Sequence, residues 1–255
     1  MSQTIKIIAA IKDGMKQACA DMYSFTDRPE LAFNAEYLFT VATAKAIDTH
    51  NFLPAHVFEI RIEYGTRKFA RDCLPLIKKS PPMVRGSTLL RGKASPKIGR
   101  PGRIDIAIYY EPTHPPTFGR IPLCAIELKG FNPQRTLVLE DLQRNLQLMR
   151  VSGLTGSSVL EFTAFAALHS VSAPKDAKAA VAKEDAIQKK YDAWMAGLGA
   201  RDDVIEVIET FTISWEPNGT VSEELDELVI DTSSRHHFIG VIVTFSRPSM
   251  LSKNP

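Results

Sequence analysis

Three charged residues within two apolar segments carry the clearest chemistry in this sequence. Asp105 lies in the segment RIDIAIYY (103–110). Glu127 and Lys129 lie in the segment IPLCAIELKG (121–130). Side chains along a β-strand alternate between its two faces, so Glu127 and Lys129 share a face. If the two segments pair as neighbouring strands, we expect Asp105 to meet both residues at one place.

Two carboxylates beside an ammonium group suit a hard, oxygen-ligated cation next to an anionic substrate. A single carboxylate within an apolar strand is costly, and three charged groups in two such strands are more so. The alternative is a cross-strand ion-pair cluster on the surface, which would contribute little energy. The apolar residues on the opposite faces of both strands favour a site over a surface cluster.

The elements around these residues alternate between helices and strands. Apolar residues at spacings of three and four indicate helices, and short alternating or apolar runs indicate strands. The expected helices cover residues 5–22, 29–48, 136–150 and a segment that starts at 172–174 and ends at 197–199. The expected strands cover residues 56–65, 103–110, 121–130, 159–171, 204–215 and 237–245. This order predicts an α/β fold with a mixed central β-sheet flanked by helices.

The chain length and composition predict a single domain over residues 1–255. Hydrophobic residues make up 44% and charged residues 24% of the chain, which is typical of a globular protein. We expect a core at about 28–171, an N-terminal helix within 1–27, and a C-terminal elaboration of a helix and strands at 172–255. The last strand is apolar on both faces, so we expect it in the interior of the sheet.

The composition also argues against a zinc site, a membrane span and a signal peptide. The cysteines number three and have no paired short spacing, which suits a reducing compartment. The N-terminal apolar run, Ile7–Ile11, ends at Lys12 and is too short for a signal peptide. No stretch approaches 18 uninterrupted apolar residues. We therefore expect a cytoplasmic protein. His236 and His237 have no carboxylate at ligand spacing, which favours packing at a strand end.

Charge is distributed unevenly along the chain. Residues 67–103 hold eleven Lys or Arg against one acid, and residues 202–231 hold ten acids and no Lys or Arg. Residues 78–103, most of the basic segment, are rich in Pro, Gly and Ser, and this composition predicts a long loop. A basic cluster is typical of proteins that bind the phosphate backbone, whereas the alternative is a solvated loop. The candidate nucleic-acid-binding residues are Arg91, Lys93, Lys97, Arg100 and Arg103. The two segments either attract each other or form separate solvated surfaces.

The charged residues also resemble a known active site. Gly102-Arg103-Ile104-Asp105, followed 22 positions later by Glu127-Leu128-Lys129, resembles the bipartite site of the restriction-endonuclease-like superfamily, the PD-(D/E)xK nucleases. In that family a helix carrying a Glu precedes the catalytic strands, as Glu36 does here. A helix and a strand follow them, as 136–150 and 159–171 do here. The resemblance implies a restriction-endonuclease-like core.

The resemblance covers about residues 28–171. The stretch Glu140-Asp141-Leu142-Gln143-Arg144 is similar to an acidic-Leu-x-Arg stretch seen on the corresponding helix of the family. Ile104 stands where many members have Pro.

The resemblance implies a role for each matching residue. Asp105 and Glu127 would hold Mg²⁺, with Mn²⁺ able to substitute, together with the backbone carbonyl of Leu128. Glu36 would add a ligand directly or through water, although Glu59 and Glu63 on the next strand are competing candidates. Lys129 would orient the attacking water, help to deprotonate it and neutralise charge on the phosphate.

The sequence therefore predicts a Mg²⁺-dependent endonuclease that hydrolyses phosphodiester bonds, with DNA favoured over RNA, in restriction, defence or repair. One alternative is a catalytically idle protein of the same fold that binds nucleic acid or a protein partner. Another is a subunit that needs a further chain for target recognition. Cleavage of both strands by one site per chain suggests a homodimer, by analogy. We expect Glu127→Ala and Lys129→Ala to abolish cleavage while leaving the fold nearly intact.

Overall fold

Alternating and apolar segments of the chain assemble into one mixed β-sheet. A computed structural model describes residues 3–25, 35–51, 57–78, 89–90, 96–110, 120–224 and 227–248. Its six-stranded sheet has the order β1-β4-β5-β8-β12-β9. The strands are β1 Phe58–Gly65, β4 Arg103–Tyr110, β5 Ile121–Phe131, β8 Phe162–Val171, β9 Ile205–Glu216 and β12 His236–Ser246. All neighbours are antiparallel except β5 and β8, which are parallel. The expected α/β class with a mixed, helix-flanked sheet is confirmed.

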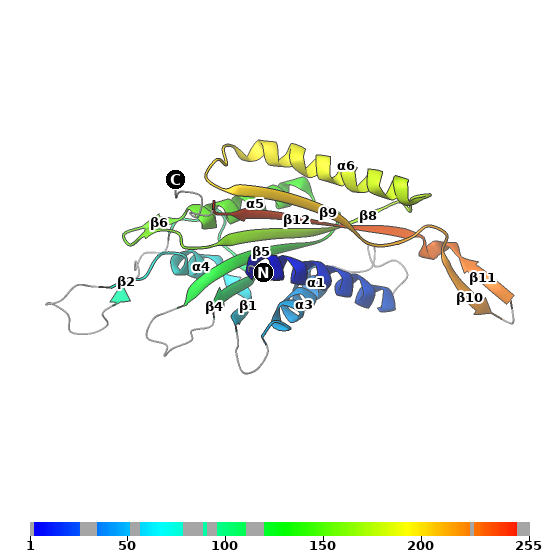
Figure 1. The fold of residues 1–255 in the computed structure, drawn as a ribbon, viewed down its shortest axis with the longest axis horizontal. Coiled ribbons are helices and arrows are strands. Elements are labelled where there is room, and N and C mark those ends of the chain that lie inside the picture. The colour runs from blue at the N-terminus through cyan, green and yellow to red at the C-terminus, as the bar shows by residue number, and fades with distance from the viewer. Residues whose placement is uncertain are drawn as a thin grey trace, which may run out of the picture.

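Helices cover both faces of the sheet (Figure 1). On one face lie α1 Gln3–Phe25 and α3 Ala35–Asp48, and on the other lie α4 Thr66–Asp72, α5 Arg135–Arg150 and α6 Ala177–Met195. Two parallel neighbouring strands need a crossover connection, and α5 supplies it between β5 and β8. Asp176 caps α6, because its Oδ1 accepts a hydrogen bond of 2.7 Å from the backbone N–H of Ala179.

The strands divide their side chains between two apolar cores. Ile106 and Ile126 pack with α1 and α3, whereas Ala107 and Ala125 pack with α4, α5 and α6. This is the alternation that strand geometry imposes. The first core also needs α1 and α3 to approach closely: a Cβ built on Gly14 would lie 2.5 Å from Thr43 Cα. Successive residues of β4 and β5 therefore face different helix layers.

Several short elements extend from this framework. They are β2 Ile77–Lys78 with β3 Leu89–Leu90, β6 Ser152–Gly153 with β7 Gly156–Ser157, β10 Thr220–Glu224 with β11 Glu227–Asp231, and the single turns η2 Ala196–Leu198 and η3 Thr232–Ser234. The β2–β3 pair and the β10–β11 hairpin lie at opposite ends of the long axis (Figure 1). The paired strands β2 and β3 correct the expectation of one long loop over 78–103, as does Arg103, the first residue of β4.

The long elements agree with the sequence in kind, with shifted boundaries. The strand expected from 159 begins at Phe162, and the helix expected from 172–174 begins at Ala177. The start of the helix expected at 29–48 lies outside the described residues, as does most of the connection between β4 and β5. β12 lies between β8 and β9, which confirms its interior position. The helix α4 and the β10–β11 hairpin were not expected.

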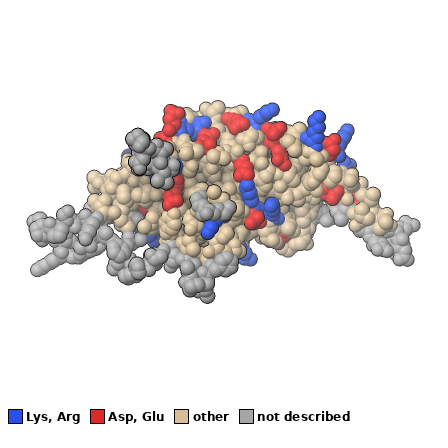
Figure 2. Space-filling view, in the orientation of Figure 1, with Lys and Arg blue, Asp and Glu red and all other residues tan. Residues whose placement is uncertain are grey.

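The acidic segment forms β9 and the β10–β11 hairpin. On and before β9, Glu206 pairs with Arg201, Glu209 with Lys12 on α1, and Asp203 with Arg150 at the end of α5. Lys and Arg are interspersed with Asp and Glu along the edge of the molecule where α6 lies (Figure 2). These acids therefore have partners outside the basic segment.

In the described part of the chain, no helix is both long enough and apolar enough to span a membrane. The three cysteines, Cys19, Cys73 and Cys124, are buried.

Candidate active site

Strand pairing brings the three expected residues together. Asp105 lies on β4, and Glu127 and Lys129 lie on the neighbouring strand β5. Asp105 Oδ2 accepts a hydrogen bond of 2.6 Å from the backbone N–H of Leu128, which fixes this carboxylate between the two β5 side chains. Asp105 is 8% exposed and Glu127 is 1% exposed. The alternative of a surface ion-pair cluster is therefore wrong for these carboxylates.

Glu36 reaches the same place from the first turn of α3. Its Oε1 lies 3.0 Å from Lys129 Nζ, which donates to it. The two competing candidates have other partners: Glu59 accepts a hydrogen bond of 2.8 Å from Arg120, and Glu63 lies 3.6 Å from Arg103. Of the three, Glu36 is thus the carboxylate that joins the candidate site.

Arg144 reaches the site from α5. Its Nε donates to Glu127 Oε1 at 2.8 Å, and its Nη2 lies 2.6 Å from Glu127 Oε2. Such a two-pronged contact is the strongest arrangement of arginine with a carboxylate. Burial opposes the charge on Arg144, but Glu127 and Asp141 outweigh it and raise the pKa of the guanidinium. Both oxygens of Glu127 therefore face a protein cation.

Asp141 is a fourth carboxylate, one helical turn before Arg144. It is 1% exposed, and its Oδ1 accepts from Arg144 Nη2 at 2.8 Å and from Arg100 Nη1 at 3.2 Å. Its Oδ2 lies 3.2 Å from Lys129 Nζ, but the geometry is not that of a hydrogen bond, and no described group donates one to this oxygen. Arg100 also pairs with Glu140 at 2.7 Å. Asp141 thus joins all three cations of the cluster.

Burial dominates the protonation of this ionic cluster. It raises the pKa of Asp105 to about 6, although the Leu128 N–H and Lys129 act in the opposite direction. Burial also raises the pKa of Glu127 well above its usual value, with Arg144 opposing it. Burial would lower the pKa of Lys129, but Asp141 and Glu36 outweigh it and raise that pKa. Lys129 is therefore a cation at neutral pH.

The oxygen donors have the right chemistry for Mg²⁺ or Mn²⁺, but this arrangement does not offer them to a metal. Glu127 faces Arg144, Asp105 Oδ2 faces the Leu128 N–H, and the Leu128 carbonyl accepts a hydrogen bond of 3.1 Å from Lys129 Nζ. Within the described ranges, no three His, Cys, Asp or Glu side chains are grouped so as to hold a metal ion. Glu127 and the Leu128 carbonyl could ligate a cation only after these contacts change.

Only part of the expected basic surface lies in the described residues. Arg91 and Lys93 are outside them. Lys97 is exposed, and the Arg103 side chain is 69% exposed. Arg100 instead turns toward the cluster, where it pairs with acids of α5. Lys97, Arg100 and Arg103 therefore all present charge at the surface, and Arg100 also pairs with acids of α5.

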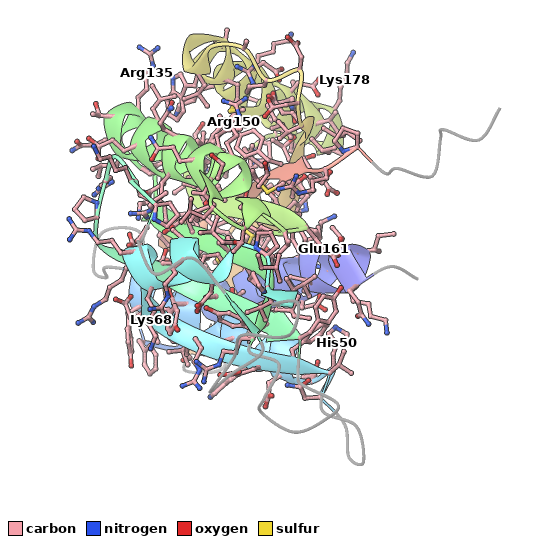
Figure 3. All side chains as sticks on the ribbon, turned by 90° about the vertical axis from the view of Figure 1, so that its left-hand side faces the viewer. His50, Lys68, Arg135, Arg150, Glu161 and Lys178 are labelled. Carbon is pink, nitrogen blue, oxygen red and sulfur yellow. The ribbon has the colours of Figure 1, made fainter. Side chains whose placement is uncertain are left out.

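A hollow of about 690 Å³ adjoins the cluster on the outer side of α5. Its wall includes Arg100, Arg144, Gln143 and Gly197. Arg135 also lines it, at the start of α5, and Figure 3 shows that helix between α4 and α6. The hollow gives the Arg144 side of the cluster an opening toward solvent.

Sequence reasoning assigned no role to Asp141 and Arg144. The signal for them was present: with Asn145, they are polar residues on the buried side of α5, among apolar neighbours at helical spacing. The contact between Glu127 and Arg144 argues against the expectation that Glu127→Ala leaves the fold nearly intact, because that change would leave Arg144 buried without its main partner.

The two adjacent histidines serve packing, as expected. His236 Nε2 lies 3.0 Å from Ser214 Oγ, and the His236 ring contacts Tyr23 and Phe238. His237 is fully buried, with Nε2 2.8 Å from Thr212 Oγ1.

The chain was compared with protein families, curated proteins and solved structures. No family model, no curated protein and no solved structure matches it. The functional assignment of the chain therefore rests on its own residues and their geometry.

Proposed function

We propose that this protein is a metal-dependent nuclease that hydrolyses phosphodiester bonds, with DNA favoured as the substrate. The observation that carries the proposal is the meeting of Asp105, Glu127 and Lys129 on two neighbouring strands, with Glu36 beside them. Buried ionisable groups with strongly shifted pKa values gather at functional sites more often than elsewhere.

The element order supports the same proposal. An α-helix carrying Glu36 precedes three antiparallel strands, β1, β4 and β5, and then α5 leads to the parallel strand β8. This is the order on which the resemblance to restriction-endonuclease-like proteins depends. The core that we propose therefore spans α3 to β8.

The side chains of the site have separate roles in this reaction. A bound Mg²⁺ would supply a water of lowered pKa and neutralise phosphate oxygens. Asp105, Glu127 and Glu36 are the residues that would hold it. In the metal-free protein, Asp141 and Glu36 raise the pKa of Lys129. We assign Lys129 the orientation of the attacking water and the neutralisation of phosphate charge.

The second candidate is a catalytically idle protein of this fold that binds nucleic acid or a protein. The observation in its favour is the two-pronged contact of Arg144 with Glu127, because it neutralises a carboxylate that the metal would need.

A nicking assay distinguishes the two candidates. Supercoiled plasmid, linear duplex, single-stranded DNA and RNA are each incubated with the protein in Mg²⁺, Mn²⁺ or chelator. We expect metal-dependent cleavage that Lys129→Met reduces by at least about a hundredfold, since one such electrostatic group contributes on that order. Lys45→Met, an exposed lysine near the end of α3, is the matched control and should cleave like the parent. Absence of metal-dependent cleavage on all four substrates would refute the nuclease and favour the idle protein.

A further inference from the structure

We propose that Arg144 is a gate for the metal site: it holds Glu127 in the free protein and must shift onto Asp141 before a divalent cation can bind. The inference rests on the proposed function, since it concerns how the same carboxylates become able to hold a metal. It starts from the mismatch between the donor chemistry of the cluster and its present arrangement.

The closed state is defined by the contact between Arg144 and Glu127. Both oxygens of Glu127 are within 2.8 Å of Arg144 nitrogens, and the carboxylate is 1% exposed. A divalent ion approaching Glu127 would meet the positive charge of Arg144 and, across Asp141, that of Lys129. The protein's own cations therefore oppose metal entry.

Asp141 is an alternative ion-pair partner for Arg144. It already accepts a hydrogen bond from Arg144 Nη2 at 2.8 Å. Its Oδ2 is buried and receives no hydrogen bond from a described group, so this oxygen can accept a further one. A buried arginine that lost its only carboxylate would be strongly unfavourable. With Asp141 as the second partner, Arg144 can leave Glu127 and remain paired.

The shift itself is short, because Arg144 Nη2 already contacts both carboxylates, at 2.6 Å from Glu127 Oε2 and 2.8 Å from Asp141 Oδ1. The hollow beside α5 borders Arg144 and Arg100, whereas Asp141 and Glu127 do not line it. The hollow therefore places open space beside the two arginines of the gate.

Arg100 links the gate to nucleic acid. Its side chain is 44% exposed, and its Nη1 lies 3.2 Å from Asp141 Oδ1, the same atom that Arg144 contacts. A phosphate backbone that attracts Arg100 would remove this contact, and Asp141 would then be free to hold Arg144 more fully. Substrate binding would in this way favour the metal-binding state.

Direct measurement of Mn²⁺ binding tests the gate without relying on cleavage. The full chain is titrated with Mn²⁺ in the absence of nucleic acid, and free Mn²⁺ is measured by electron paramagnetic resonance. We expect Arg144→Gln to bind Mn²⁺ at least about tenfold more tightly than the parent, within the usual range of coupling between sites. Adding Glu127→Gln to this variant should remove the gain. Arg150→Gln is the control, because Arg150 lies on the same helix but pairs with Asp203.

A second variant covers the case in which Arg144→Gln does not fold. Arg100→Gln changes a partly exposed side chain, so circular dichroism should match the parent. We expect a gain in Mn²⁺ affinity of about fivefold, at the lower end of the usual coupling between sites. The proposal would be overturned if Arg144→Gln and Arg100→Gln, where they fold, bind Mn²⁺ no more tightly than the parent. It would also be overturned if the gain in Mn²⁺ affinity persists after Glu127→Gln is added. If Mn²⁺ affinity rises in these variants but no substrate is cleaved, the gate is supported and the proposed nuclease function is refuted. If substrate is cleaved but the variants and the parent bind Mn²⁺ equally, the nuclease function is supported and the gate is refuted.

Discussion

Replacing Arg144 with Met should destabilise the fold more than a change at any surface arginine. Met keeps much of the length and the apolar packing of the side chain but removes its charge and its donors. Glu127 would then be buried without the two contacts of 2.8 and 2.6 Å that it has now. Breaking one side of a buried ion pair costs about 3–5 kcal/mol. We expect a loss of this size in the free energy of unfolding at pH 7.5.

The loss should depend on pH with a definite sign. Burial already raises the pKa of Glu127, and Arg144 is the main group that opposes this rise. In Arg144→Met the folded-state pKa of Glu127 rises further above its unfolded value. The folded protein then holds the proton that the unfolded chain releases, so stability falls as pH rises. The deficit relative to the parent should therefore be smaller at pH 5.5 than at pH 7.5.

Urea unfolding followed by circular dichroism at both pH values measures the effect. A double-mutant cycle with Glu127→Gln isolates the pair, and we expect a coupling energy of about 2–3 kcal/mol, at the upper end for residues in contact. Arg150→Gln, on the exposed end of the same helix, should change the free energy of unfolding by less than about 1 kcal/mol. A loss below about 1 kcal/mol in Arg144→Met, with no dependence on pH, would contradict the buried pair.

Three further predictions concern other parts of the protein. As pH rises from 3.8 to about 6, the parent should lose stability relative to Asp105→Asn, because the pKa of Asp105 is raised in the fold. The difference in the free energy of unfolding, measured by urea unfolding, should reach about 3 kcal/mol. Equal pH profiles of the two proteins would show that the pKa of this carboxyl is not raised. Asp176→Ala should lower the free energy of unfolding by about 1 kcal/mol through loss of the α6 cap, and an unchanged value would indicate that the cap is not formed in solution. Lys97→Gln and Arg103→Gln should each reduce the slope of log affinity against log salt by about 0.9 on duplex DNA, as filter binding at several salt concentrations would show; unchanged slopes would mean that these side chains are only solvated.

The sequence predicts the framework well where periodicity is long and strong. β12 is apolar on both faces, and this pattern places it in the interior of the sheet between β8 and β9. The β10–β11 hairpin and the short helix α4 escape such reasoning. Each strand of the hairpin has five residues and α4 has seven, so none of them is long enough to show a distinct apolar period.

The same contrast holds at the candidate site. Strand parity is enough to bring Asp105, Glu127 and Lys129 to one place, because the period of two fixes the face of every strand residue. The sequence pattern cannot show that Arg144 reaches from α5 to Glu127. Helical spacing gives the direction in which a side chain leaves the helix, but not which residue of the neighbouring sheet a long side chain contacts. Charged residues on the buried side of α5 were the available sign that a partner existed.

The position of β12 sets an order for building the sheet. β9 precedes β12 in the chain, yet in the described sheet it is bonded to β12 alone, and β12 is bonded on its other side to β8. β9 can therefore join the six-stranded sheet only together with or after β12. During synthesis, β9 would leave the ribosome before the strand it needs, with its backbone groups still bonded to water. Until β12 is made, β9 is an unpaired strand that other chains can reach.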